Sequence, residues 1–383
     1  MKLIPYSRQD INKKDISCVI KTLKSDFITQ GPKVKEFEKK ICNYTKGRYA
    51  VATNSATSAL HISCLALGLK TNDIVWTVPN SFVASSNCAL LCGAKIDFVD
   101  IDSESYNLSI SSLEKKLLKA KKEKKIPKIL IVVHLAGNPC DMKEIYKFKK
   151  KYKFKIIEDA SHALGSVYYG NKVGSCIYSD VTVFSFHPVK MITTGEGGVA
   201  VTNQKKLFNL MQLFRDHGIK RFINKKKKWF YNQVLLGLNY RITDIQCALG
   251  LSQFTKLDSW VKKRNYLAKR YSKMLSNLPL VLPKIDGKKI SSFHLYVIKI
   301  DKAQTNIKRD FIFNHLRSKN IMVNIHYIPI YRHSFYKKFN FKKKNFPQCE
   351  EYYNSAISIP LFTSLNIKNQ NKIIKEIKSI FLS

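Results

Sequence analysis

The pattern of apolar and polar residues predicts that helices and strands alternate along the first part of the chain. Apolar residues recur with a helical period over residues 10–25, and a second amphipathic helix is predicted from residue 34 to about residue 44. A short strand is predicted at residues 49–52, and the apolar helix that follows it ends near Gly68. This order of elements indicates the beginning of an α/β domain.

Six further segments are predicted to be strands that alternate with helical stretches. Several of them are continuous apolar runs, which is typical of strands that are covered on both faces. The pattern therefore predicts a three-layer α/β/α domain. The predicted strands are residues 74–78, 95–99, 129–133, 155–158, 181–186 and 198–202.

The pattern changes in the second half of the chain. Strand signals fade over residues 205–260, and a new set of elements begins after Pro279 and Pro283. Because 383 residues exceed the usual size of one hydrophobic core, we predict a large α/β domain over residues 1–260 and a smaller α+β domain over residues 261–383. The predicted elements of this half are helices at residues 243–256, 260–275, 309–317 and from 367 onward, and strands at residues 294–300 and 322–326.

The net charge of +40 raises the question of nucleic-acid binding. Only ten of the 67 basic residues are arginine, the residue that makes bidentate contacts with phosphates and guanine. The lysines are spread over nearly every segment, which indicates solvated faces, and the run at residues 225–228 is predicted to be a solvated loop. We therefore expect no nucleic-acid site, although the charge favours an anionic substrate through long-range steering.

The nine cysteines form no CxxC pair and have no metal-ligand spacing with histidine, so no metal site is predicted. Cys88 and Cys92 lie one helical turn apart, and we interpret them as small packed residues rather than as ligands. An odd, unpatterned cysteine count indicates a reducing compartment. Since the chain has no apolar run of about 18 residues, we expect no membrane span and a cytoplasmic location.

The segment around Lys190 is the strongest candidate for chemistry. A predicted strand ends near Ser185, a single lysine follows at position 190, and a glycine-rich turn at residues 195–198 leads into the next strand. A lysine in such a loop is usually exposed to solvent. Here its neighbours are apolar, and desolvation would lower the pKa of the lysine and make its amine a competent nucleophile.

A second segment places Glu158, Asp159 and His162 at the end of a predicted buried strand. Ligands of α/β sheets bind at the carboxyl ends of the strands. Asp159 alone is equally well explained as a helix N-cap, but beside a lysine that forms a Schiff base it acquires a specific role. Pyridoxal phosphate (PLP) needs a carboxylate against its pyridine nitrogen, because the protonated ring is the one that accepts electrons.

The third segment, residues 54–58, lies at the start of a predicted helix and is rich in hydroxyl groups. Backbone N–H groups and hydroxyls at a helix start bind anions, which suits the phosphate of the cofactor. Helix capping is the alternative role, and both can hold at once. Ser185 could supply a further hydroxyl to the phosphate. Phe82 could stack on the cofactor ring, although a phenylalanine at such a position is more often a core residue.

Together these segments resemble the DegT-type sugar aminotransferases, a branch of the fold-type I PLP enzymes, and the resemblance extends over residues 6–360. It implies an aspartate aminotransferase-like fold with a smaller C-terminal domain. Within the family, the residues of these motifs are most similar to those of the members of the pseudaminic acid pathway. One branch of the family has histidine in place of the lysine and removes oxygen, and Lys190 argues against that branch. The phrases that carry the resemblance are SDFITQGP (25–32), NSATSA (54–59), SHALGS (161–166), SFHPVKMITTGEGGVAVTN (185–203), ALGLSQ (248–253) and HYIPIY (326–331).

The resemblance also implies roles for single residues. Lys190 would carry PLP as a Schiff base, with Asp159 on the pyridine nitrogen and His162 near the phenolic oxygen. The other cofactor contacts that it implies are Ala56, Thr57, Phe82, Ser185 and Asn239, the last of which would reach a phosphate from the neighbouring subunit of a homodimer with shared active sites. The implied substrate-lining residues are Tyr6, Asp26, Phe27, Ile28, Thr29, Ala56, Ser185, Asn239, Asn324, Ile325, His326 and Tyr327, of which Asp26 and Phe27 differ between family members.

The implied reaction moves the amino group of L-glutamate, by way of pyridoxamine phosphate, to C4 of a UDP-linked 4-keto-6-deoxysugar. Related aminotransferases of legionaminic acid, bacillosamine or perosamine synthesis are the nearest alternatives. A PLP-bound regulator that binds nucleic acid without turnover is an alternative of another class. It is disfavoured because the sequence has no helix-turn-helix segment and its basic residues are mostly lysine.

Overall fold

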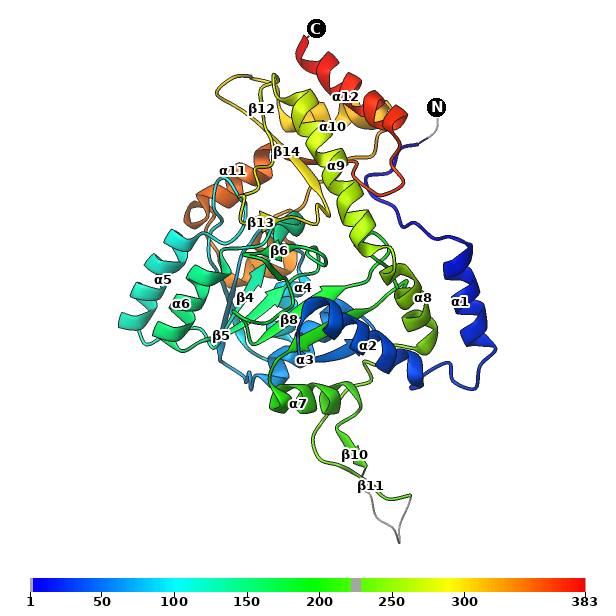
Figure 1. Ribbon diagram of the computed structural model, residues 1–383. Helices are drawn as coiled ribbons and strands as arrows, with labels where there is room; N and C mark the ends of the chain where they lie inside the picture. The colour runs from blue at the N-terminus through cyan, green and yellow to red at the C-terminus, as the bar shows by residue number, and fades with distance from the viewer. Residues whose placement is uncertain (1–2, 222–228, 383) are drawn as a thin grey trace.

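The computed structural model describes residues 3–221 and 229–382, so the loop predicted at residues 225–228 lies outside the described residues. A seven-stranded sheet with the strand order β1-β9-β8-β5-β4-β2-β3 runs through the centre (Figure 1). Neighbouring strands are parallel except at β9, which is antiparallel to both β1 and β8. Each strand lies within one residue of its predicted position. The strands are β1 (Tyr49–Thr53), β2 (Ile74–Thr77), β3 (Lys95–Phe98), β4 (Ile129–Val133), β5 (Lys155–Asp159), β8 (Val181–Ser185) and β9 (Gly198–Thr202).

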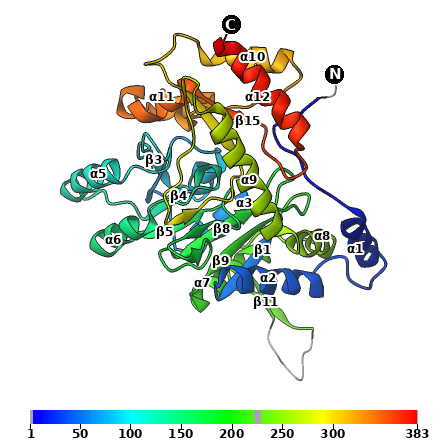
Figure 2. The same ribbon diagram turned by 45° about the horizontal axis from the view of Figure 1, so that its top comes forward.

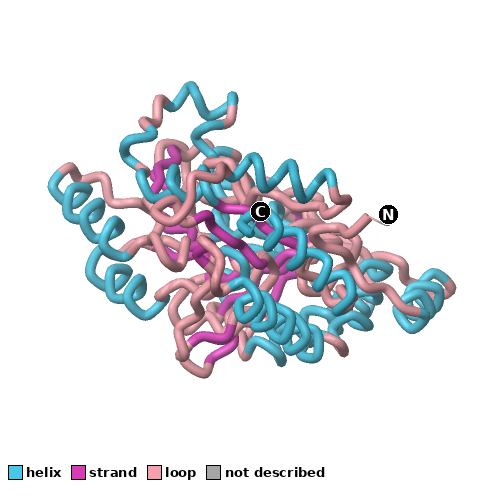
Figure 3. The backbone as a smooth tube through the Cα atoms, turned by 90° about the horizontal axis from the view of Figure 1, so that it is seen from above, coloured by secondary structure: helices cyan, strands magenta, loops and turns pink. Residues whose placement is uncertain are grey.

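Helices cover both faces of this sheet, which confirms the predicted three-layer arrangement (Figure 3). Val51 of β1 belongs to the same buried cluster as Leu60, whereas the next residue, Ala52, belongs to a second cluster with Phe37. Because successive side chains of a strand point to opposite faces, the two clusters lie on opposite faces of the sheet. The helices around the sheet are α1 (Lys13–Leu23), α2 (Pro32–Thr45), α3 (Ala56–Ala66), α4 (Ala84–Leu90), α5 (Ile110–Lys122), α6 (Met142–Tyr152), α7 (Lys205–Arg215) and α8 (Asp244–Phe254).

Two smaller sets of strands lie outside the central sheet. The strands β10 (Ile219–Arg221) and β11 (Tyr231–Gln233) form an antiparallel hairpin that projects from the body of the molecule next to α7 (Figure 1). The strands β6 (Val167–Tyr168), β7 (Asn171–Lys172) and β13 (Lys289–Ile290) form a short antiparallel sheet. The third of these strands ties the C-terminal third of the chain to the segment that follows β5.

The C-terminal part of the chain forms an α+β layer of its own. The strands β12 (Leu280–Val281), β14 (Tyr296–Ile300) and β15 (Ala356–Ile359) pair antiparallel, and α10 and α12 lie together at this end of the molecule (Figure 2). Their apolar side chains form a third buried cluster, which includes Ile298, Ile312 and Ile377. The helices of this part are α9 (Leu257–Leu275), α10 (Arg309–Ser318), α11 (Pro347–Ser355) and α12 (Ile367–Leu382).

Helix α9 joins the two cores. Leu257 and Val261, in its first turns, belong to a cluster of the central sheet, whereas Leu267, Tyr271 and Leu275 belong to the C-terminal cluster. One helix therefore packs against both parts of the molecule. The division at residues 260 and 261 stays a prediction.

The prediction of a strand at residues 322–326 is wrong. This segment pairs at single positions only: Ile321 pairs with Ile4, and Asn324 pairs with Ser358. The strand next to β14 is instead β15, which the apolar pattern did not single out. The prediction failed because Ile321 and Val323 are fully buried, so burial alternates as in a strand while the backbone does not continue a ladder.

Two findings bear on the surroundings in which the protein works. Within residues 3–221 and 229–382, no helix has the length and the apolar character that crossing a membrane requires. All nine cysteines are free thiols. The cytoplasmic location stays a prediction.

Candidate active site

Lys190 lies in a tight loop five residues after the end of β8. Its backbone N–H donates to the carbonyl oxygen of His187 (2.9 Å), and the N–H of Thr194 donates to the carbonyl oxygen of Phe186 (3.0 Å). Burial lowers the pKa of the Lys190 amine to about 8, against the opposing effect of the negative charges of Asp159 and Glu196. A usable share of the amine is therefore uncharged near neutral pH, as a nucleophile requires.

Asp159 is the last residue of β5, and it lies beside β8 at the same edge of the sheet as the Lys190 loop. One carboxylate oxygen accepts a hydrogen bond from Ser85 Oγ (2.6 Å), and the other accepts from Ser161 Oγ (2.6 Å) and from the N–H of Ser161 (3.2 Å). Residues 160–166 form turns and no helix, so Asp159 caps no helix. These three bonds fix the orientation of a buried carboxylate close to Lys190.

His162 is buried and neutral. Burial is the main cause that holds its pKa well below the usual range, and the charge of Lys190 adds to it. The N–H of Ala136 donates to Nδ1 of His162 (3.3 Å), so the ring proton belongs on Nε2, which lies 3.1 Å from the hydroxyl of Tyr327. The ring also packs against that of His294, with 4.3 Å between the centroids. His162 therefore presents one N–H in a fixed direction.

The start of α3 forms an anion-binding turn beside β8 and β9. Ser55 Oγ accepts from the N–H of Ser58 (3.1 Å), and Ser58 Oγ donates to Oδ1 of Asn54 (2.6 Å). The backbone N–H groups of the first helical turn, which include those of Ala56 and Thr57, have no partner inside the helix and can bind an anion. Capping and anion binding are thus compatible here.

Gly198 brings Ser185 and the α3 turn together. Ser185 at the end of β8 pairs with Gly198 of β9, and a Cβ atom at Gly198 would lie 2.4 Å from the carbonyl carbon and oxygen of Ser55. Only glycine permits this approach between a strand and a helix start. The side chain of Ser185 and the amides of α3 therefore lie on one side of the sheet edge, as a phosphate site requires.

Residues from the C-terminal layer complete the site. The ring of Tyr327 lies 6.2 Å from that of Phe82, and Tyr6 lies 5.5 Å from His326, centroid to centroid. Phe82 is 60% exposed, so it is no core residue. Nδ1 of His326 lies 2.8 Å from Ser358 Oγ, and burial, together with the charge of Lys190, lowers the pKa of His326 to about 3.

The structure does not bring all of the predicted residues to the site. The segment Asp26, Phe27, Ile28 and Thr29 is exposed, and its backbone bonds lead to the start of α8, where Ile28 accepts from the N–H of Asp244 (3.0 Å) and Thr29 pairs with Thr243. Asn239 is also exposed and pairs with Asp216. Its neighbour Tyr240 touches the α3 turn, because the carbonyl oxygen of Tyr240 accepts from the N–H of Asn54 (2.9 Å). Asn324 and Ile325 lie beside His326, and Oδ1 of Asn324 accepts from the N–H of Ile325.

Several residues of the site were missed in the sequence. Ser85 and Ser161 hold Asp159, the Oδ1 atom of Asn80 accepts from the N–H of Tyr327 (3.1 Å), and His294 packs on His162. Ser161 belongs to the phrase SHALGS, so its position beside Asp159 was a usable signal. His294 offered none, because only the fold brings it next to residue 162.

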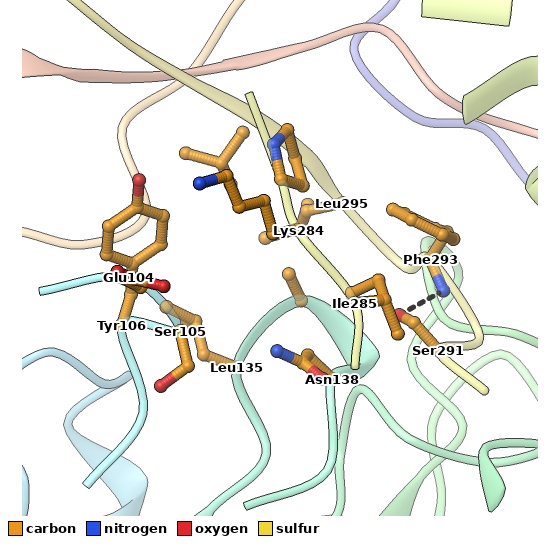
Figure 4. A pocket seen from close by; sticks show the side chains of 13 residues that line it. Glu104, Ser105, Tyr106, Leu135, Asn138, Lys284, Ile285, Ser291, Phe293 and Leu295 are labelled. Carbon is orange, nitrogen blue, oxygen red and sulfur yellow. Dashed lines mark hydrogen bonds between the residues drawn. The ribbon is translucent and has the colours of Figure 1, made fainter. Parts of the chain in front are cut away.

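A separate cavity of about 30 Å³ is lined in part by Ala136, whose N–H donates to His162. Its lining includes Tyr106, Leu135, Asn138 and Phe293, which surround it in Figure 4. A space of this size holds a water molecule or two and no cofactor. It is therefore distinct from the candidate active site around Lys190.

The residues around Lys190 fit a PLP site. They comprise an amine of lowered pKa, a buried carboxylate whose orientation is fixed, a neutral imidazole and an anion-binding turn. Among the described residues, no group of histidine, cysteine and acidic side chains could hold a metal ion. The fold and this site together define the class of PLP-dependent fold-type I transferases.

Comparison with known proteins gives the family. The model of the DegT/DnrJ/EryC1/StrS aminotransferase family matches residues 9–378, and the chain belongs to this family of PLP-dependent enzymes.

Three relatives illustrate the similarity. The UDP-4-amino-4,6-dideoxy-N-acetyl-β-L-altrosamine transaminase of Campylobacter jejuni subsp. jejuni (strain 81-176) is 40% identical over 375 residues, which cover 98% of this chain and 96% of the relative. PseC of Helicobacter pylori, an aminotransferase involved in the biosynthesis of pseudaminic acid, has a similar structure with a TM-score of 0.90 at 32% identity over all of both chains. Spr1654 of Streptococcus pneumoniae, in its PMP form, has a TM-score of 0.90 at 29% identity over 98% of each chain.

Proposed function

We propose that the protein transfers the amino group of L-glutamate to C4 of UDP-2-acetamido-2,6-dideoxy-β-L-arabino-hex-4-ulose. The product is UDP-4-amino-4,6-dideoxy-N-acetyl-β-L-altrosamine, an intermediate of pseudaminic acid biosynthesis. The observation that carries the transfer chemistry is the desolvated Lys190 amine beside the oriented Asp159 carboxylate. The choice of sugar is supported by the 40% identity with the Campylobacter jejuni transaminase over nearly the whole chain.

Each residue of the site has a role in this proposal. When bound, PLP supplies an electron sink that stabilises negative charge on the carbon next to the transferred nitrogen. Asp159 would hold a proton on the pyridine nitrogen, and the amides of Ala56 and Thr57 together with Ser185 Oγ would bind the phosphate. His162 would lie near the phenolic oxygen of the bound cofactor, and Phe82 would lie against one face of its ring.

Lys190 also moves protons. Its amine takes a proton from Cα of L-glutamate and returns one to C4 of the sugar in the second half of the reaction. Nζ suits this proton transfer because burial lowers its pKa to about 8, so that the amine can both accept and donate a proton near neutral pH. Tyr6, His326 and Tyr327 close the site on the side of the C-terminal layer, where they would exclude water from the reacting carbon.

Two experiments test the proposal. Borohydride reduction of the enzyme with PLP, followed by peptide mapping, should label Lys190, and labelling of another lysine would contradict the mechanism. The pyridoxamine form should then be offered UDP-, GDP- and dTDP-linked 4-keto-6-deoxysugars. Fastest turnover of the L-arabino UDP sugar supports the proposed substrate. Preference for another sugar would assign the enzyme to the legionaminic acid, bacillosamine or perosamine type.

The working unit in this proposal is a homodimer in which Asn239 reaches the cofactor phosphate of the neighbouring subunit. Asn239 is exposed, and exposed apolar side chains precede it: Tyr231 on the hairpin strand β11 is 55% exposed, and Leu236, between the hairpin and Asn239, is 85% exposed. Exposed apolar residues on a projecting hairpin are suited to burial against a second subunit.

Subunit complementation tests this arrangement. Inactive Lys190→Ala and inactive Asn239→Ala chains are mixed, dissociated and reassociated, and each mixed dimer should then regain one intact site. No recovery in dimers that are shown to be mixed would place Asn239 in its own subunit's site. A fully active monomer would contradict the shared sites altogether.

A further inference from the structure

A groove of about 680 Å³ lies beside the cavity that Tyr106 and Asn138 line, outside the residues that the proposed reaction uses. The loop before α5 with its first turns, the turn before α6 and the segment that leads into β13 line the groove. Glu104, Asn138 and Lys284 line both spaces, so the two adjoin. We call the larger space the acidic groove and the smaller one the recess.

Negative charge gathers around the acidic groove although the chain as a whole is strongly basic. Five of the 27 acidic residues line it, against two of the 67 basic residues. Glu104 and Glu114 are exposed, and neither forms an ion pair within the part of the chain that the structure describes. One of the two lysines, Lys289, is held by Asp141 (Nζ to Oδ1, 2.7 Å). The groove is therefore suited to a cationic ligand. The carboxylates are those of Asp102, Glu104, Glu114, Asp141 and Asp286.

The recess has two buried polar atoms that lack a partner. Asn138 is 8% exposed, and its Oδ1 atom accepts no hydrogen bond from any described residue. The hydroxyl of Tyr106, which is 7% exposed, also has no partner within residues 3–221 and 229–382, and both side chains line the recess (Figure 4). Buried polar groups without a partner are costly and rare in folded proteins. A hydrogen-bond donor that enters the recess would satisfy both atoms.

An organic cation meets these two observations better than a metal ion. Among the described residues, no group of histidine, cysteine and acidic side chains converges on a point where a metal could bind. The carboxylates are instead spread along the groove, and Oδ1 of Asp102 already accepts from the N–H and the Oγ of Ser105 (both 2.8 Å). A linear polyamine carries its charges at intervals along a flexible chain, and each ammonium group is about the size of the water molecule that the recess can hold.

We propose that the acidic groove binds a linear polyamine, with one terminal ammonium group in the recess against Oδ1 of Asn138 and the hydroxyl of Tyr106. The other ammonium groups lie along the groove against the carboxylates of Asp102, Glu104 and Glu114. Hydrogen bonds from a charged donor are stronger than those from a neutral one, so the recess fixes the orientation of the ligand while the groove supplies most of the attraction.

Isothermal titration calorimetry of the enzyme with PLP, with spermidine as the probe, tests the binding. At about 0.15 M salt the Debye length is about 8 Å, so distant lysines are screened and the carboxylates of the groove dominate. We expect saturable binding of one spermidine per chain. Glu104→Gln/Glu114→Gln should weaken it at least about threefold, whereas Glu144→Gln, at an exposed pair with Lys147, should not change it. No saturable binding, or equal weakening in the control, would overturn the proposal.

Tyr106→Phe separates binding from folding. The variant should bind spermidine at least about tenfold more weakly, because a hydrogen bond to a charged group is lost. Its free energy of unfolding in urea should not fall, since that hydroxyl has no partner to lose among the described residues. Asn138→Ala should weaken binding in the same way. Unchanged affinity in both variants would show that no ammonium group enters the recess and would contradict the proposal.

Lys284→Met should act in the opposite direction. Lys284 lines both spaces, so removal of its charge should strengthen the binding of spermidine, and weaker binding would count against a cationic ligand. Magnesium chloride at matched ionic strength should not displace spermidine, and displacement would assign the groove to a metal ion instead. These measurements need neither glutamate nor a sugar nucleotide, so their failure is distinct from a failure of the proposed function.

Discussion

At the scale of single residues, the site consists of candidate catalytic residues that the sequence reveals and of residues hydrogen-bonded around them that only the structure reveals. Asp159, His162 and Lys190 could be predicted because each lies at or within five residues of a strand end and has unusual neighbours. Ser85 and Asn80 could not, because a serine hydroxyl in a helix such as α4, or an asparagine amide in a loop, has no distinctive sequence pattern until the fold places it. The hidden residues orient the visible ones, and they do so through short side-chain contacts.

The ionisation of Lys190 leads to a pH dependence. The uncharged amine attacks the aldehyde of the cofactor, and the pKa of Lys190 is lowered to about 8. The rate at which PLP adds to the apoenzyme should therefore rise with pH through about 8 and level off above it. Stopped-flow absorbance between about pH 6 and about pH 10 measures this rate. Lys190→Ala should show no such phase, and a rate independent of pH would be inconsistent with the lowered pKa.

Asp159→Asn should retain PLP but lose most activity, because a neutral amide cannot hold the charge of the pyridinium ring. Breaking one side of a buried charge pair costs about 3–5 kcal/mol, which corresponds to a loss of roughly two to four orders of magnitude in kcat. The comparison variant is Ser161→Ala, which removes one hydrogen bond to the same carboxylate and should cost about 0.5–1.5 kcal/mol. Near-normal turnover of Asp159→Asn would leave that carboxylate without a role in catalysis.

At the scale of elements, the central strands were predictable and the edges of the molecule were not. Strands such as β4 and β9 are buried along their whole length, and a continuous apolar run reports that burial directly. The segment at residues 322–326 shows the limit. Its burial alternates as in a strand, but its backbone leaves the ladder after one pair so that His326 and Tyr327 reach the site. Periodicity reports which face is buried and not which backbone groups are paired.

Glu158 ties three strands together on the face of β5 opposite to Asp159. Its carboxylate oxygens contact His134 Nε2 (2.8 Å) after β4, and accept from Thr182 Oγ1 (2.9 Å) in β8 and from Ser179 Oγ (2.5 Å) before it. Glu158→Gln leaves these donors without a charged acceptor and should lower the free energy of unfolding by about 1.5–3 kcal/mol. Urea unfolding measures the loss. Glu144→Gln, which affects only an exposed pair with Lys147, should change it by at most about 0.5 kcal/mol.

Gly198→Ala should weaken cofactor binding more than it weakens the fold. The added methyl group would meet the backbone of Ser55, so β9 and the start of α3 must separate and the anion-binding turn must shift. Fluorescence titration of the apoenzyme with PLP should show a dissociation constant raised at least about tenfold, or roughly 1.4 kcal/mol. The matched control is Gly287→Ala, where a Cβ atom meets nothing within 4 Å. Equal PLP affinity of the two variants would show that the close approach is dispensable.

At the scale of the whole molecule, the excess of positive charge has a measurable consequence. A net charge of +40 attracts a nucleotide-linked sugar over a distance that salt shortens, since the Debye length falls from about 30 Å at 0.01 M to about 3 Å at 1 M. The value of kcat/KM for the sugar nucleotide should fall severalfold over this range of salt, with little change in kcat. Steady-state rates in sodium chloride measure the effect. A kcat/KM that is insensitive to salt would mean that the lysines only solvate the surface.

The N-terminal segment joins the C-terminal layer beside the site, and this has a consequence for the order in which the protein matures on the ribosome. Ile4 exchanges backbone hydrogen bonds with Asn320 and Met322, and the carbonyl oxygen of Tyr6 accepts from the N–H of Leu361. Synthesis begins at the amino end, so Tyr6 leaves the exit tunnel long before the segment that it must join. The central sheet and Lys190 can be in place while Tyr6 still has no partner. The pocket therefore closes late, after Leu361 has emerged.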